Sequence, residues 1–217
     1  MDKARRRFRF SSRSDLHLLR KLWHMGGGAV LLGLYFLFPS LGQKGYSYCI
    51  LSLGLVAFIF ESLRLKYRFL NHMVLLVGKP LMRDTEKYDY TALPFYLWGI
   101  GLSFFLFREH IAVLAVLFLG FSDPVASYFG LKYGSIKLYV NKSLEGTIAG
   151  FTACYIITLS YGLLFHGPSP ALLVFALFAA MFGALSELLS MYIDDNFTIP
   201  LVSGAGMTLL NHVIHLF

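Results

Sequence analysis

Residues 121–150 read FSDPVASYFG LKYGSIKLYV NKSLEGTIAG, and we expect the fold and the function of the chain to depend on this stretch. It places Asp123 inside an apolar segment, residues 111–129, and then runs through a basic loop to a second apolar segment that begins at Gly146. A carboxylate in a membrane-type segment costs roughly 2.5–3.5 kcal/mol on insertion scales, so we expect Asp123 to serve a function. The alternative is that Asp123 pairs with a lysine and only fixes helix packing.

The composition predicts an integral membrane protein. Of the 217 residues, 57% are hydrophobic and only 14% are charged, whereas soluble domains average about 25% charged residues. The apolar runs are continuous and do not alternate every second residue, which favours an all-α polytopic transmembrane bundle over a β-barrel. We expect a single transmembrane catalytic domain, residues 22–217, after a basic segment, residues 1–21. The seven expected spans are residues 22–38, 46–60, 92–107, 111–129, 146–165, 171–192 and 199–217.

The formal net charge of +7 does not indicate a nucleic-acid partner, because the basic residues lie between the apolar spans. The alternate loops 1–21, 61–91 and 130–145 hold 17 of the 19 lysines and arginines, and the opposite side holds only Lys44 and Arg108. The positive-inside rule therefore predicts a cytoplasmic N-terminus. Within the loop 61–91, residues 69–77 are apolar enough to lie along the membrane surface.

With this topology, polar residues from four separate segments meet on the cytoplasmic face. We therefore predict a site for a charged ligand there. The segments contribute Arg20, Lys21 and His24; Asp123 and Ser127; Lys142, Ser143 and Glu145; and Glu187, Asp194, Asp195 and Asn196.

The loop at residues 141–150 suits a phosphate. Lys142 and Ser143 precede a helix that is expected to begin near Gly146, and backbone amides at a helix N-terminus attract anions. The loop is not a Walker A motif, because it lacks GxxxxGK[ST] and no strand precedes it. The alternative is a lysine that extends toward the membrane surface beside a serine that caps the helix.

The sixth expected span carries a polar stripe that ends in an acidic turn. Gly183, Glu187, Ser190 and Asp194 are spaced four, three and four residues apart, which places them on one helix face. Magnesium prefers one or two carboxylates plus substrate phosphates, so Asp123 with Asp194 or Asp195 could hold Mg²⁺ on a polyphosphate. The alternative is a solvated acidic turn that caps a helix.

Arg20, Lys21 and His24 share one face at the start of the first span. Three glycines at residues 26–28 follow them and allow a close approach by a helix or a ligand. A positive-inside anchor would also explain Arg20 and Lys21, although it explains His24 less well.

Four blocks of this sequence resemble the family of dolichol kinases, phytol kinases and CTP-dependent diacylglycerol kinases. The blocks are RKLWH (20–24), SDPVASYFGLKYG (122–134), NKSLEGTIAG (141–150) and DDNFTIPLVSG (194–204). The resemblance implies phosphorylation of a lipid hydroxyl, with CTP as donor and Mg²⁺ or another divalent cation as cofactor. The residues that it implicates are Arg20, Lys21, His24, Asp123, Lys132, Lys142, Ser143, Glu145, Gly146, Asp194, Asp195 and Asn196.

We expect the following roles in such a transfer, which depends mainly on positioning and on charge neutralisation. Metal ligands would come from Asp123, Asp194, Asp195 and Asn196, and Lys142 with Lys132 would balance phosphate charge. Asp123 or Glu187 would accept the proton of the lipid hydroxyl. The expected partners are a nucleoside triphosphate and a membrane lipid alcohol, either diacylglycerol or an isoprenoid alcohol. The choice between a monomer and a homo-oligomer stays open.

Two other functions remain as alternatives. The first is a CDP-lipid synthase, because two blocks also resemble phosphatidate cytidylyltransferases. Those enzymes continue with a glycine- and histidine-rich segment that ends in an Asp-Arg pair, whereas here residues 204–206 are followed by Met207, Thr208 and Leu209. The second is a transporter without chemistry, but the charged residues gather at one face and no inverted repeat is evident.

Overall fold

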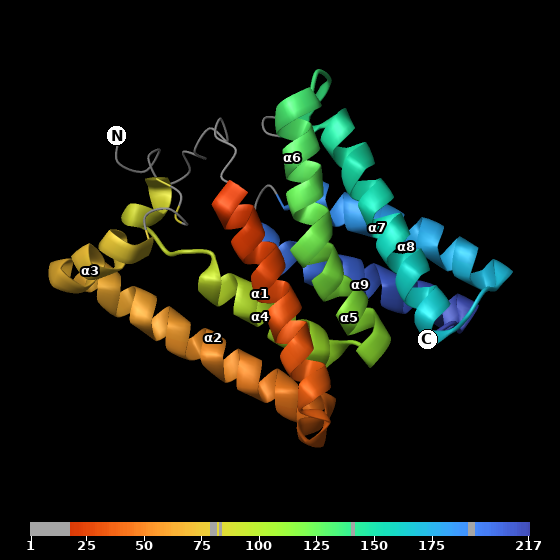
Figure 1. The fold of residues 1–217 in the computed structure, drawn as a ribbon, viewed down its shortest axis with the longest axis horizontal. Coiled ribbons are helices and arrows are strands. Elements are labelled where there is room, and N and C mark those ends of the chain that lie inside the picture. The colour runs from red at the N-terminus through yellow and green to blue at the C-terminus, as the bar shows by residue number, and fades with distance from the viewer. Residues whose placement is uncertain (1–17, 79–81, 83, 140–141, 191–193) are drawn as a thin grey trace.

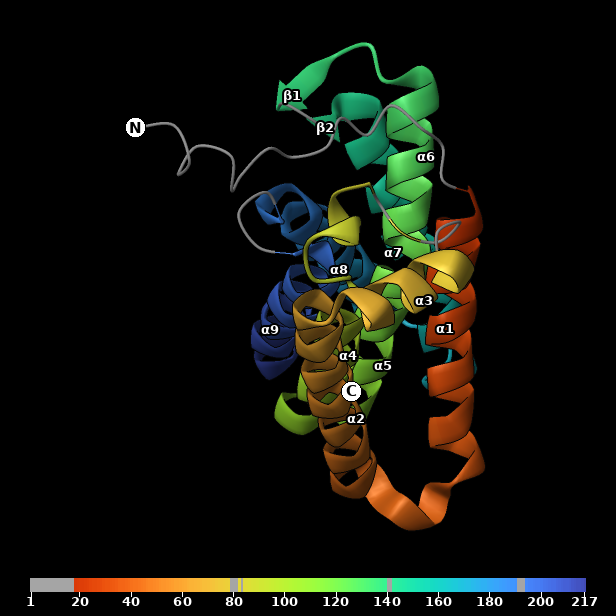
Figure 2. The same cartoon turned by 90° about the vertical axis from the view of Figure 1, so that its left-hand side faces the viewer.

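The structure is a computed structural model, and it describes residues 18–78, 82, 84–139, 142–190 and 194–217. Most of the basic segment 1–21 and the expected end of the sixth span, residue 192, lie outside these residues. Figure 1 shows a bundle of helices, and Figure 2 shows the small β-hairpin at one end of it. The helices are α1 (Leu18–Leu37), α2 (Gly42–Lys66), α3 (Arg68–Gly78), α4 (Leu93–Leu106), α5 (Glu109–Leu117), α6 (Asp123–Tyr133), α7 (Leu144–Phe165), α8 (Pro170–Leu189) and α9 (Asp195–Ile214), with 3-10 turns η2 (Pro39–Leu41) and η3 (Asp84–Lys87), a π-helix η4 (Phe118–Ser122) and antiparallel strands β1 (Lys137–Tyr139) and β2 (Lys142–Ser143).

The described part of the chain contains five helices that are long and apolar enough to cross a membrane. They are Pro39–Lys66, Glu109–Tyr133, Leu144–Phe165, Pro170–Leu189 and Asp195–Ile214. The expectation of an all-helical, multi-pass membrane protein is therefore confirmed, but the count of seven spans is not. The first and third expected spans do form helices, α1 and α4, yet α4 has only 14 residues, where crossing requires about 20.

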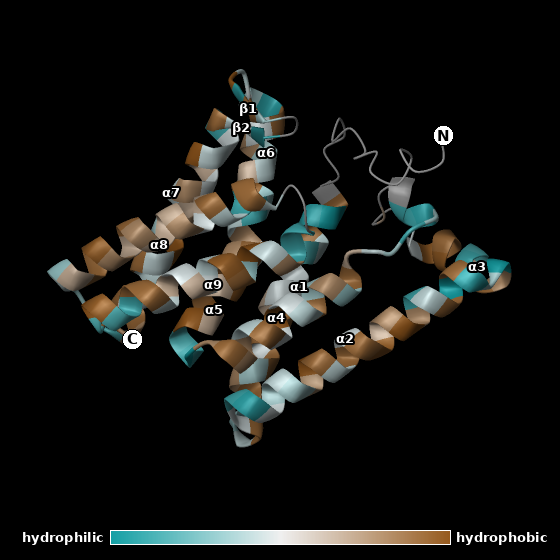
Figure 3. Cartoon of the chain, turned by 180° about the vertical axis from the view of Figure 1, so that it is seen from behind, coloured by the Kyte–Doolittle hydropathy of each residue, from teal (hydrophilic) through white to brown (hydrophobic). Residues whose placement is uncertain are grey.

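Hydropathy along the ribbon agrees with a membrane protein. In Figure 3, hydrophobic residues run along α2, α7 and α8, and the hydrophilic residues gather near helix ends and in the connections. Large apolar side chains point outward, for example Val56, Leu164 and Leu173, each at least half exposed. In a membrane these side chains would face lipid.

The centre of the bundle is a continuous helical rod that runs from Glu109 through η4 to Tyr133. Most of its first half is buried, and Ile111, Leu114 and Phe118 are each 0% exposed. Helices α1, α4, α7 and α9 pack around it, and α1 runs beside it in the opposite direction (Figure 1). Asp123 therefore follows the buried part of the rod, on the side of the bundle where the hairpin lies.

The long connection between α2 and α4 is more ordered than its sequence suggested. Its apolar part forms α3, which crosses the end of α2 and has no buried residue (Figure 2). Arg64, at the end of α2, is 0% exposed and donates hydrogen bonds to Glu61, to Asn71 and to the backbone carbonyls of Glu86 and Asp89. One buried guanidinium thus holds α3 and the backbone at Glu86 and Asp89 against the end of α2.

Candidate functional site

Asp123 sits at a break in the regular helix of the central rod. The five residues Phe118–Ser122 form a π-helix, and Asp123 is the first residue of the α-helix that follows, with Pro124 next to it. π-Helices are rare and occur frequently at functional sites, because the wider turn re-aims the side chains that follow it. Asp123 Oδ1 is buried and has no hydrogen-bond partner among the described residues. A buried carboxylate oxygen in this state needs a cation or a proton donor.

Helices α6 and α7 approach one another through glycine. A Cβ atom on Gly146 would lie 2.8 Å from the Ala126 carbonyl oxygen and 3.0 Å from Gly130 Cα, so only glycine fits there. A Cβ atom on Gly150, one turn further along α7, would lie 3.0 Å from Ala126 Cβ and 3.5 Å from Glu187 Oε2. This close contact brings the loop before α7 against the helix that carries Asp123.

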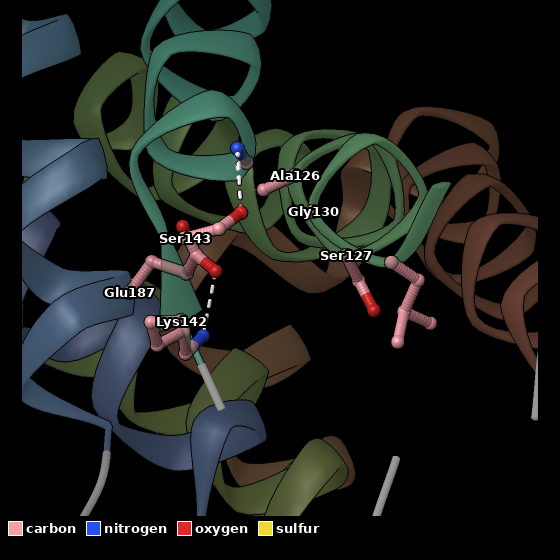
Figure 4. A pocket seen from close by; sticks show the side chains of 8 residues that line it. Ala126, Ser127, Gly130, Lys142, Ser143 and Glu187 are labelled. Atoms are coloured by element: carbon pink, nitrogen blue, oxygen red, sulfur yellow. Dashed lines mark hydrogen bonds and ion pairs between the residues drawn. The ribbon is translucent and has the colours of Figure 1, made fainter. Parts of the chain in front are cut away.

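Lys142 and Glu187 form a buried ion pair beside this contact. Lys142 Nζ donates to Glu187 Oε1 at 2.6 Å, and the two residues are 7% and 6% exposed. Figure 4 shows the two side chains facing one another, with Ser127 standing apart on α6. They line a small pocket of about 40 Å³, together with Ala126, Ser127, Gly130, Leu131, Ser143 and Gly146. The buried ion pair and the first turn of α7 therefore share one small polar pocket.

The first backbone amides of α7 form hydrogen bonds within the protein. Ser143 Oγ accepts a hydrogen bond from the Gly146 amide at 3.2 Å, and the Leu144 amide donates to the Ile136 carbonyl at 2.8 Å. Glu145 Oε1 accepts from the backbone amides of Ser135 and Ile136 at 3.0 and 3.1 Å. Ser143 therefore caps α7, as the alternative reading of this serine predicted. Glu145 holds the loop before β1 through these hydrogen bonds and does not line the pocket.

Lys132 lies outside the pocket. It is exposed, its Nζ donates to the Tyr128 hydroxyl at 3.1 Å, and it lies over the rings of Tyr128 and Tyr133 at 5.4 and 5.1 Å from their centroids. The structure therefore separates Lys132 from Lys142, although both were expected to balance the same phosphate charge.

The N-terminal turns of α1 lie at the level of Asp123. Lys21 Nζ is 5.9 Å from the centroid of the Tyr128 ring, and a Cβ atom on Gly28 would lie 3.7 Å from Gly120 Cα. Because α1 and the central rod are antiparallel, these two contacts place His24 level with Asp123. The His24 ring packs edge-on against Tyr96 on α4, with 4.9 Å between ring centroids.

Arg20 pairs with a residue that the sequence did not indicate. Its Nη1 atom donates to both carboxylate oxygens of Glu86, at 2.7 and 2.9 Å. Glu86 lies in η3, within the connection that Arg64 holds. No motif signalled this pairing, because 66 residues separate the partners.

The acidic turn at the start of α9 is a helix cap. Asp194 Oδ1 accepts from the Asn196 backbone amide at 3.0 Å and from Asn196 Nδ2 at 2.6 Å, and Asn196 Nδ2 also donates to Asp195. No group of three or more His, Cys, Asp or Glu side chains that could hold a metal lies within the described residues. The side chains of this turn therefore bond to one another, and the role of Asp123, Asp194, Asp195 and Asn196 as metal ligands stays a prediction.

Comparison with known proteins identifies the family. The chain is 30% identical over 218 aligned positions to CTP-dependent diacylglycerol kinase 1 of Saccharomyces cerevisiae, covering 91% of this chain and 73% of the yeast protein. The chain belongs to the CTP-dependent diacylglycerol kinase family. This membership confirms the resemblance carried by the four sequence blocks.

Two further relatives in this family carry the same name. The protein of Schizosaccharomyces pombe is 31% identical over 176 positions, covering 74% of this chain and 79% of that protein. The protein of Eremothecium gossypii is 27% identical over 213 positions, covering 87% and 65%. No family model matches the chain, and no solved structure matches it.

Proposed function

We propose that this protein is a lipid kinase that transfers the γ-phosphoryl group of CTP to the hydroxyl of diacylglycerol. The name of the relatives supports both substrates. The observation that carries the proposal is the buried Lys142–Glu187 pair, which lies against α6 where Asp123 has an unpartnered carboxylate oxygen among the described residues. A buried lysine beside a carboxylate supports this proposal, because the lysine can neutralise phosphate charge and the carboxylate can accept a proton.

In this proposal the incoming phosphate replaces Glu187 as the partner of Lys142. Lys142 Nζ and Glu187 Oε1 are 2.6 Å apart before the phosphate arrives. Once Lys142 turns to the phosphate, Glu187 is released at the same place and can accept a proton. The charge of the lysine stays compensated throughout, and the buried Glu187 carboxylate, once separated from the lysine, gains affinity for a proton.

The chemical step follows from these positions. The diacylglycerol hydroxyl oxygen attacks the γ-phosphorus, the bond to the β-phosphate oxygen breaks, and the products are phosphatidate and CDP. The hydroxyl proton passes to a carboxylate, Glu187 or Asp123. A divalent cation held by Asp123 would supply further neutralisation of phosphate charge. Lys142 stabilises the negative charge that shifts to the transferring group and to CDP.

The membrane arrangement is part of the proposal. We place the N-terminal end of α1, the hairpin and the start of α9 at the cytoplasmic face, because 17 of the 19 basic residues lie in the loops on that side. Helices α1 and α4 would complete a set of seven spans with the five candidate membrane helices. The lipid would then enter sideways from the bilayer, and its headgroup would meet the site at the interface.

Purified protein in detergent tests the proposal. CTP and ATP are supplied separately, each with diacylglycerol, a polyprenol, phytol or phosphatidate. We expect turnover with CTP and diacylglycerol, giving CDP and phosphatidate. Turnover of phosphatidate with release of pyrophosphate would instead identify a CDP-lipid synthase, and the absence of turnover with every lipid would contradict an enzymatic role.

A further inference from the structure

A network of buried charges joins the connection between α2 and α4 to the start of α1. Arg20 is 9% exposed, Glu86 is 7% exposed and Arg64 is 0% exposed. Glu61 and Arg64 pair at 2.7 Å, and Glu61 Oε2 also accepts from the Thr91 amide at 2.9 Å. Burying this many charges is expensive unless all are paired, so the network must hold its members in fixed positions.

The geometry of the Arg20–Glu86 pair is unusual. An arginine and a carboxylate usually form two parallel hydrogen bonds that use two nitrogen atoms of the guanidinium. Here both Glu86 oxygens bond to the single atom Nη1. The other amino group, Nη2, is buried and has no hydrogen-bond partner among the described residues. One half of the guanidinium is therefore anchored, and the other half is available to an anion.

Arg20 belongs to the N-terminal turns of α1, which lie at the level of Asp123. Arg20 lies on the same helix arc as Lys21 and His24, and Lys21 lies over the Tyr128 ring of α6. The antiparallel register that places His24 level with Asp123 places Arg20 about one turn further on, level with Ser127. Ser127 lines the pocket of Lys142 and Glu187.

We propose that Glu86 is a positioning residue: it anchors one side of Arg20 so that Nη2 is pre-oriented toward the phosphates of the nucleotide. The Arg64 network fixes the backbone of Glu86 and so makes the connection between α2 and α4 part of the nucleotide site. This inference rests on the proposed function, because it takes the nucleotide as the anion. An arginine pre-oriented in this way loses less side-chain entropy on binding.

A double-mutant cycle between Arg20 and Glu86 tests the proposal. The variants Arg20→Ala, Glu86→Ala and the double variant are purified, and KM for CTP, kcat with diacylglycerol and the melting temperature are measured. We expect Glu86→Ala to raise KM for CTP roughly tenfold with kcat changed much less, as expected for one lost charge-assisted hydrogen bond. In the Arg20→Ala background the same change should have no further effect on KM. An unchanged or lower KM for CTP in Glu86→Ala, or additive effects in the cycle, would overturn the proposal.

A charge swap separates positioning from stability. Arg20→Glu combined with Glu86→Arg restores the ion pair but moves the guanidinium to η3. We expect the melting temperature to recover and KM for CTP to stay high, whereas recovery of KM would show a merely structural pair. Gln43→Ala is the matched control, because Gln43 joins α2 to the Phe104 and Phe107 carbonyls at the opposite end of α4. It should lower the melting temperature and leave KM unchanged, and equal effects of Gln43→Ala and Glu86→Ala on KM would count against the proposal.

The same data distinguish a failure of the proposed function from a failure of the proposed role of Glu86. If the wild-type protein turns over no lipid with CTP, the proposed function fails. If the wild-type protein is active and Glu86→Ala binds CTP normally, only the role of Glu86 fails.

Discussion

Lys142 Nζ and Glu187 Oε1 lie 2.6 Å apart in a buried pocket, although 45 residues separate them in the sequence. The pair joins the return strand of the hairpin to the last turns of α8. Breaking a buried ion pair by removing one partner costs about 3–5 kcal/mol, whereas removing both charges together is often neutral. This difference makes the pair accessible to experiment.

Replacing both members of the pair should abolish activity without unfolding the protein. In Lys142→Met/Glu187→Gln no uncompensated charge remains, so we expect a melting temperature within a few degrees of wild type. Phosphorylation of diacylglycerol should fall at least about 100-fold, because the phosphate loses its cation. Lys142→Met alone should melt well below the double variant. Activity retained in the folded double variant would remove this pocket from the mechanism.

The unpartnered oxygen of Asp123 predicts a loss of function without a loss of stability. Asp123→Asn keeps the shape of the side chain and removes its charge. Among the described residues, Oδ1 of Asp123 accepts no hydrogen bond that this change would break. We expect turnover to fall by roughly two orders of magnitude and the melting temperature to stay unchanged or to rise. Glu109→Gln, at the other end of the same rod, is the control and should remain active. Equal activity in the two variants would argue against a role for Asp123.

The glycine contact between α6 and α7 predicts a variant that disturbs the pocket from outside it. In Gly146→Ala the new methyl group would lie 2.8 Å from the Ala126 carbonyl oxygen, so the helices must move apart. We expect a loss of about 1–3 kcal/mol in the free energy of unfolding and weaker CTP binding. Gly33→Ala, where no atom lies within 4 Å of the added carbon, should gain up to about 1 kcal/mol from helix propensity. A neutral Gly146→Ala would show that the two helices are not as close as described.

Arg64 predicts the largest effect on stability among the charged residues outside the pocket. Arg64→Met would leave the Glu61 carboxylate without its cation and two backbone carbonyls without this donor, at a cost of about 3–5 kcal/mol. Arg64→Lys should recover only part of the loss, because an ammonium group cannot reproduce the five bonds of the planar guanidinium. The melting temperature of each variant measures both effects, and a lysine variant as stable as wild type would contradict this account of the network.

The sequence predicted the membrane helices and many residues of the pocket for good physical reasons. Continuous apolar runs identify buried or lipid-facing helices, and Lys142, Ser143 and Gly146 follow one another in a single loop. For Ser143 and Asp194, side chains that bond the nearby backbone are local features, so the capping alternatives could be stated from sequence as well.

Other features could not be predicted because they depend on tertiary contacts. The Lys142–Glu187 and Arg20–Glu86 pairs join distant segments, and no spacing rule relates their partners. The π-helix before Asp123 changes the helix register without a sequence signal. The count of seven spans rested on apolarity alone, and it did not account for the length of α4, which ends after 14 residues.

The fate of doubly labelled CTP tests the central claim most directly. CTP labelled at the α- and γ-phosphates with two different isotopes is supplied with diacylglycerol to the wild-type protein and to Lys142→Met/Glu187→Gln. The account predicts that the wild-type protein moves only the γ-label into lipid, as phosphatidate, that the α-label stays in CDP, and that the double variant moves neither. Transfer of the α-label into lipid, or equal transfer of the γ-label by both proteins, would contradict it.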